Sequence, residues 1–152
     1  MKQSKKDDNI QQQMQPGMIT RDGMLGEDRR KLRDIIEADA ADVGRLGLVH
    51  SQIASRMLEL RNAGARGLGE PIRVNDTFEI RVDGVRGKLP CPFGHPGLYA
   101  KEFIIVRNLR SDEQVTYTRL NIHLIEAHGF YEGLGSSFRQ DPATLARVLE
   151  IS

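Results

Sequence analysis

The apolar residues of the first half of the chain recur at helical spacing. One helix is expected over residues 27–43 and a second over residues 48–62, because each stretch carries one apolar stripe beside charged positions. The two stripes contain Leu32, Ile35, Ile36, Val43, Val49, Ile53, Met57 and Leu60. A short glycine-containing connection between two amphipathic helices predicts a helical hairpin. Its apolar faces need a partner surface, either in the same chain or in a second copy of it.

The apolar period changes after residues 63–71, a stretch with three glycines and a proline that is typical of a linker. Over residues 78–82, Phe, Ile and Val alternate with Glu and Arg, which predicts a strand with one buried face. The dipeptide Asp83-Gly84 is a strong hairpin signal. We therefore expect the return strand over residues 85–89.

The remaining elements complete a mixed pattern. Two further strands are expected over residues 103–107 and 114–117, followed by a helix over residues 118–128 that ends at Gly129. The last helix has the clearest start signal, an Asp-Pro pair at residues 141–142 that provides an N-cap and a proline in the first turn. Together these elements predict an α+β fold: a helical hairpin, a small β-hairpin/helix unit and a C-terminal helix.

Three regions are expected along the chain. Residues 1–24 lack an apolar period and are rich in Lys, Gln, Asp and Met, which predicts a disordered tail. Residues 25–64 form the helical hairpin, and residues 71–152 form the second α+β unit. The alternative arrangement packs these two units together as one domain.

Composition narrows the class of protein. Of the 152 residues, 39% are hydrophobic and 28% are charged, without the ~20 consecutive apolar residues of a transmembrane helix. The polar start of the chain lacks the apolar stretch of a secretory signal, and one cysteine cannot form an internal disulfide. We therefore expect a cytoplasmic protein that has no membrane partner.

Candidate metal ligands are concentrated in the second half of the chain. The only cysteine and three of the four histidines form two pairs, Cys91 with His95 and His123 with His128. Zinc favours four sulfur and nitrogen ligands, which proteins commonly supply as two close pairs. The first pair follows a predicted strand in a Pro/Gly turn, and the second lies on a predicted helix. Five helical residues turn by about 500°, so His128 is the ligand that helix geometry favours least.

At the level of the motif, residues 89–129 resemble a zinc finger of the two-Cys, two-His class. A turn pair precedes a spacer and a helix that carries the histidine pair, with Leu120 three residues before His123. Two features depart from the class: His95 replaces the second cysteine, and 27 residues separate the pairs instead of about 12. The resemblance implies one zinc ion and four ligands, but we do not extend it to nucleic-acid binding. Those ligands are Cys91, His95, His123 and His128.

A closed site with four protein ligands is typical of structural zinc and stabilises a small fold. The chain is then expected to be a zinc-binding module, which binds an unknown protein partner or self-associates through its N-terminal helices. If Cys91 does not bind the metal, an open three-histidine site could hold a water, as in zinc hydrolases. A nucleic-acid partner is a further alternative, because residues 71–111 carry seven basic against four acidic side chains. The net charge of +1 does not favour it.

Two other features bear on binding. Residues 129–139 combine glycines with aromatic residues, which is typical either of a turn that returns aromatic side chains to the core or of a ligand-binding loop. The side chains of such a loop would be Tyr131, Ser136, Ser137 and Arg139. His50 lies beside an apolar helical stripe, and we expect it to be a packed residue rather than a metal ligand.

Overall fold

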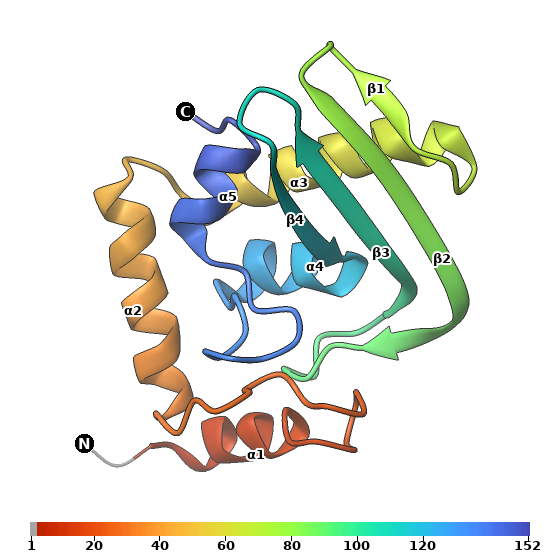
Figure 1. The fold of residues 1–152 in the computed structure, drawn as a ribbon. Coiled ribbons are helices and arrows are strands. Elements are labelled where there is room, and N and C mark those ends of the chain that lie inside the picture. The colour runs from red at the N-terminus through yellow and green to blue at the C-terminus, as the bar shows by residue number, and fades with distance from the viewer. Residues whose placement is uncertain (1–2) are drawn as a thin grey trace.

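The computed structural model describes residues 3–152 and shows an α+β fold built on an antiparallel sheet (Figure 1). Its strands lie in the order β1-β2-β3-β4, and they are Ile72–Val74, Phe78–Pro90, Leu98–Asn108 and Glu113–Thr118. The helices are α1 (Lys5–Gln13), α2 (Leu32–Arg45), α3 (His50–Gly64), α4 (Arg119–His128) and α5 (Pro142–Val148), with a 3-10 turn at Ala65–Gly67. The predicted fold class is therefore confirmed.

The main core lies between the sheet and the helices α3, α4 and α5. Phe78 and Ile80 face this core, as the alternating pattern predicted, and the register places Ile80 opposite Val106 on β3. The buried hydroxyl of Tyr117 donates a 2.8 Å hydrogen bond to the carbonyl oxygen of Met57, which joins the sheet to α3. One layer of helices therefore covers one face of the sheet, and β4 leads directly into α4.

The β2–β3 hairpin turns later than the sequence predicted. Strand β2 continues through Asp83-Gly84, which pair with residues 103 and 102 of β3, so the predicted turn at this dipeptide is wrong. A two-residue hairpin turn needs a positive φ in its central positions, but neither residue has one. The pairing register instead shifts between Gly84 and Lys88, and the chain reverses over residues 91–97. The expected return strand over residues 85–89 is the far half of β2.

Residues 3–28 form an N-terminal arm that packs on the rest of the molecule (Figure 1). In place of the disordered tail expected for residues 1–24, the described part contains α1 and buries Met14 and Met24. The side chain of Gln11 accepts a hydrogen bond from the backbone of Leu32 and donates one to the carbonyl oxygen of Arg30. Only two residues of this segment, 1 and 2, lie outside the described part.

Both predicted N-terminal helices are present, with shifted ends. Their main partners differ: α2 packs mainly against α1 and α5, whereas α3 packs mainly against α4 and the sheet. The division of the chain into domains remains a prediction. Over residues 3–152, none of the helices combines the length and the apolar character needed to cross a membrane.

Candidate metal centre

The turn between β2 and β3 carries the first pair of candidate ligands. Gly94 has φ +78°, and its N–H donates to the carbonyl oxygen of Cys91 at 3.1 Å, so the chain folds back on itself. As a result, the backbone N–H groups of Phe93 and His95 hydrogen-bond to the Cys91 side chain. The cysteine is 5% exposed, whereas His95 lies at the surface. This turn therefore presents a buried sulfur and a surface imidazole.

The second pair lies on α4, whose ends are defined by local sequence. The Thr118 side chain accepts from the backbone N–H of Asn121, and the Asn121 side chain accepts from that of Thr118, which forms a reciprocal N-terminal cap. Gly129 ends the helix in the left-handed region at φ +61°. A Cβ atom there would lie 2.8 Å from the Nε2 atom of His50, so both conformation and space require glycine. His128 is thus the last helical residue.

The fold brings both pairs together, although His95 and His123 lie 28 positions apart in the sequence. The Sγ atom of Cys91 lies 3.4 Å from Nε2 of His128, and Nδ1 of His95 lies 3.3 Å from Nε2 of His123. Ligand atoms of Cys91, His123 and His128 lie within 4.8 Å of one another. These three side chains are close enough to hold one metal ion, and His95 contacts them from the solvent side.

Two aromatic residues hold the imidazoles in position. Phe93 stacks on His128 with ring centroids 4.0 Å apart and planes 8° apart. The Tyr99 hydroxyl lies 2.9 Å from Nδ1 of His123, which leaves the Nε2 atom of that ring facing the other candidate ligands. Sequence reasoning missed both aromatic residues, because only the folded hairpin brings them to the α4 histidines.

Burial and mutual proximity set the electrostatics of the cluster. Burial, together with the neighbouring His123 and His95, lowers the pKa of His128 to about 4. The pKa of His123 is also lowered, mainly by burial. Burial raises the pKa of the Cys91 thiol, against the two backbone hydrogen bonds that lower it. Without a metal, this site therefore favours uncharged side chains, and a neutral imidazole is the form that binds metal ions.

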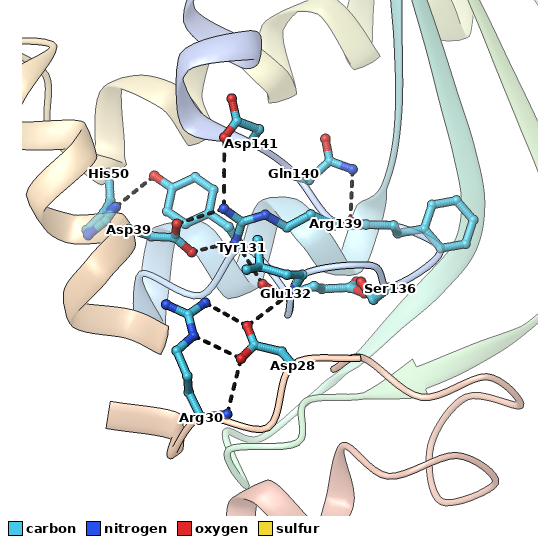
Figure 2. A network of polar contacts seen from close by, with 12 residues as sticks. Asp28, Arg30, Asp39, His50, Tyr131, Glu132, Ser136, Arg139, Gln140 and Asp141 are labelled. Carbon is cyan, nitrogen blue, oxygen red and sulfur yellow. Dashed lines mark hydrogen bonds and ion pairs between the residues drawn. The ribbon is translucent and has the colours of Figure 1, made fainter. Parts of the chain in front are cut away.

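The glycine-rich segment takes part in an internal polar network (Figure 2). The Tyr131 hydroxyl contacts Nδ1 of His50 at 2.8 Å, and Ser136 donates to the Glu132 carboxylate at 2.9 Å. Arg139 forms two hydrogen bonds of 2.6 and 2.8 Å with Asp39, as Figure 2 shows. Three of the four loop residues singled out by the sequence thus have partners inside the chain, and Ser137 is exposed. Their role as a ligand-binding loop remains a prediction.

Burial of two carboxylates of this network, Asp39 and Glu132, was not predicted from the sequence. A signal for the first was present, because Asp39 lies four residues from both Ile35 and Val43 and so falls within the apolar stripe of α2. A carboxylate in that position needs a buried cation, and Arg139 supplies it from 100 residues away. Glu132 has no comparable local signal.

Comparisons with protein-family models, curated proteins and solved structures found no match for this chain. The arrangement of side chains is therefore the guide to its chemistry. The clearest such arrangement is the group of Cys91, His123 and His128, which could hold a metal ion.

Proposed function

We propose that this chain is a small zinc-binding protein with one structural zinc ion. In a zinc tetrahedron, two nitrogen ligands lie about 3.3 Å apart, and a sulfur and a nitrogen lie about 3.6 Å apart. The contact between His95 and His123 measures 3.3 Å, and that between Cys91 and His128 measures 3.4 Å. These two distances, each joining the turn to α4, are the observation that carries the proposal. The four residues supply one sulfur and three nitrogens.

The zinc ion would link two elements that are distant in the sequence. The ligands come from the tip of the β2–β3 hairpin and from α4, and the contact between Cys91 and His128 spans 37 residues. The main core of the molecule contains none of the four ligands. The ion would therefore act as a clamp at one end of a fold that has its own core, rather than as a substitute for a core.

The closed site is favoured over an open, catalytic one because of where the sulfur lies. An open three-histidine site requires Cys91 to stay away from the metal, but its Sγ atom lies within 3.4 Å of one histidine nitrogen. The buried thiol is also a poor candidate for a nucleophile, since reactive cysteines are accessible. A closed metal site leaves function to the protein surface, and we propose a binding or regulatory module.

A protein partner is favoured over nucleic acid by the charge pairing on the open face of the sheet. Two of its arginines have acidic partners: Arg81 pairs with Asp83 at 3.0 Å, and Arg107 pairs with Asp112. Such pairing removes the clustered positive charge on which phosphate binding depends. The apolar stripes of α2 and α3 are mostly buried within the chain, so self-association, which stays a proposal, would have to use other surfaces.

The metal content of the purified protein tests the proposal. We expect about one zinc ion per chain by elemental analysis, and loss of most of it in His123→Ala and His95→Ala. His95 is exposed, so its variant tests the ligand without opening the core. His50→Gln is the matched control, because His50 is the fourth histidine and its side chain contacts the Tyr131 hydroxyl.

Cobalt spectroscopy gives a second readout of the ligand set. Cobalt bound in place of zinc should show tetrahedral d–d bands and a thiolate charge-transfer band, and Cys91→Ser should remove the thiolate band alone. A protein without zinc that also fails to bind cobalt would end the proposal. Tetrahedral cobalt bands without a thiolate band in the wild-type protein would instead identify the open three-histidine site.

A further inference from the structure

A cleft of about 210 Å³ lies between the N-terminal arm, the β2–β3 hairpin and the start of α4. Its walls are mainly apolar and include Ile19, Met24, Leu89, Phe103, Leu120 and Phe138. Neither the candidate metal ligands nor the aromatic residues that support them line it. The cleft is therefore a separate feature of the molecule.

One wall of the cleft contains a buried carboxyl group. Glu132 is 5% exposed, and its two oxygens accept hydrogen bonds from Asn121 at 2.8 Å and from Ser136 at 2.9 Å. Both donors are uncharged, and Glu132 forms no ion pair with any residue between 3 and 152. The nearby Arg139 donates to its backbone oxygen and pairs with Asp39 instead. A carboxylate oxygen can accept two hydrogen bonds, so each oxygen keeps an acceptor position.

The arm contributes a second polar group, and this group lacks a hydrogen-bond partner among residues 3–152. Thr20 lines the same cleft, and the oxygen of its hydroxyl group is buried without a hydrogen-bond partner in the described part of the chain. The arm is held there by backbone hydrogen bonds: Gly133 donates to Met24 at 2.8 Å and Glu27 to Leu134 at 3.0 Å. The residue that follows Glu132 thus anchors the arm, which places a hydroxyl and a carboxyl group in one preformed cleft.

We propose that this cleft binds a small apolar amine, whose ammonium group pairs with Glu132 and donates to the Thr20 hydroxyl, while its hydrocarbon part contacts the apolar walls. A buried carboxyl group that forms no ion pair is electrostatically complementary to an ammonium ion. The two cationic residues that line the cleft, Arg21 and Lys101, are exposed. The volume corresponds to about seven water molecules, which limits the ligand to the order of ten non-hydrogen atoms. Burial raises the pKa of Glu132 to about 7, and a bound cation would lower it again.

The probe is 2-phenylethylamine, and its neutral and anionic counterparts are 2-phenylethanol and 3-phenylpropionate. Binding to the zinc-loaded full chain is followed by amide chemical shifts in a two-dimensional NMR titration. We expect the amine to shift amides of the arm and of residues 130–136, the alcohol to bind about tenfold more weakly or less, and the acid not to bind. An amine that causes no shifts at millimolar concentration would overturn the proposal, because the cleft would then hold water alone.

Two variants and a control test the assigned contacts. Glu132→Gln keeps the shape of the side chain and should weaken amine binding about tenfold or more, and Thr20→Val should weaken it by a smaller factor. Glu37→Gln removes the same charge from the exposed face of α2, outside the cleft, and should leave binding unchanged. Unchanged amide shifts outside the cleft show that each variant is folded. Equal amine affinity in Glu132→Gln and the wild type would overturn the assignment.

Discussion

At the scale of single residues, the candidate metal centre depends on a contact that no sequence pattern marks. For Nε2 of His123 to bind a metal ion, the proton of the neutral ring must lie on Nδ1 and be donated to the Tyr99 oxygen 2.9 Å away. The hydroxyl oxygen can accept this hydrogen bond and so support the ring form that the proposed zinc site needs. Both ligand pairs could be predicted from the sequence, but this partner could not, because Tyr99 and His123 meet only after the β2–β3 hairpin folds onto α4.

Tyr99→Phe should therefore weaken zinc binding by about 10- to 100-fold while leaving the four ligands in place. Competition with a chromophoric chelator measures the affinity. The matched control is Tyr117→Phe, which removes a hydroxyl group bonded to Met57 in the main core. That variant should lower the free energy of unfolding without changing zinc affinity. Equal zinc affinities for Tyr99→Phe and the wild type would contradict the role assigned to the hydroxyl.

Glu132 makes the stability of the protein dependent on pH. Burial raises its pKa from 4.5 to about 7, against the effects of Ser136, Asn121 and Arg139, which lower it. Because the folded state binds the proton more tightly than the unfolded state, the protonated Glu132 side chain makes its full contribution to the free energy of unfolding below pH 4.5. This contribution is lost as the pH rises through 7, by roughly 3 kcal/mol at most.

Glu132→Gln cannot ionise, so the wild type should lose stability relative to this variant as the pH rises from about 4.5 to 7. Urea denaturation of both proteins at a series of pH values, with zinc in excess, measures the difference. The comparison between the two proteins cancels the pH dependence of metal binding, which both share. Parallel stability profiles across this range would show that the carboxyl group is not perturbed by burial.

At the scale of elements, glycines allow the arm to dock on the segment that follows α4. A Cβ atom on Gly133 would lie 2.3 Å from the carbonyl oxygen of Leu25, and one on Gly26 would lie 2.2 Å from the backbone nitrogen of Ser136. The sequence analysis identified residues 129–139 as a segment that could bring its backbone close to a ligand. In the structure, the close neighbour is the backbone of the chain's own arm.

Gly133→Ala should displace the arm and lower the free energy of unfolding by about 1–3 kcal/mol. Hydrogen exchange should become faster at the amides of Gly133 and Glu27, which bond across this contact. Gly44→Ala is the control, because its Cβ would meet no atom within 4 Å and its position is helical. That change should stabilise α2 by roughly 0.5–1 kcal/mol. Unchanged exchange at both amides in Gly133→Ala would contradict the docking argument.

At the scale of the whole molecule, the buried apolar residues form two clusters. The first joins the sheet to α3, α4 and α5 and includes no candidate ligand. The second lies beneath the arm and contains Cys91 together with Met14, Met24 and Leu124. The candidate metal centre is thus coupled to the second cluster through Cys91, while the first cluster is independent of it.

Removal of the proposed zinc ion should therefore loosen one end of the molecule instead of unfolding all of it. With a strong chelator, hydrogen exchange measured by mass spectrometry should accelerate in residues 91–97 and in the arm, and remain slow in β3 and α3. Without the ion, the tip of the β2–β3 hairpin is no longer linked to α4 through the metal. Complete unfolding on chelation would show that the main core is not stable alone, and no change would contradict the clamp.

Features that depend on neighbours a few residues apart can be predicted from the amino-acid sequence alone. The alternation at Phe78 and Ile80, the left-handed cap at Gly129 and the N-cap at Asp141 all appear as predicted. Each results from side-chain direction or from backbone groups within one turn of helix or strand. The pairing of candidate ligands was visible for the same reason, since the two members of each pair are at most five positions apart.

The places where distant segments of the chain meet depend on the whole fold. No turn forms at Asp83-Gly84, because β2 and β3 continue to pair as far as Pro90 and Leu98. The arm is ordered because Met14 and Met24 pack against apolar residues from other parts of the fold. The cleft with Glu132 combines segments from both ends of the chain. Such contacts depend on the complementarity of surfaces that form together, and no short-range pattern in the sequence encodes them.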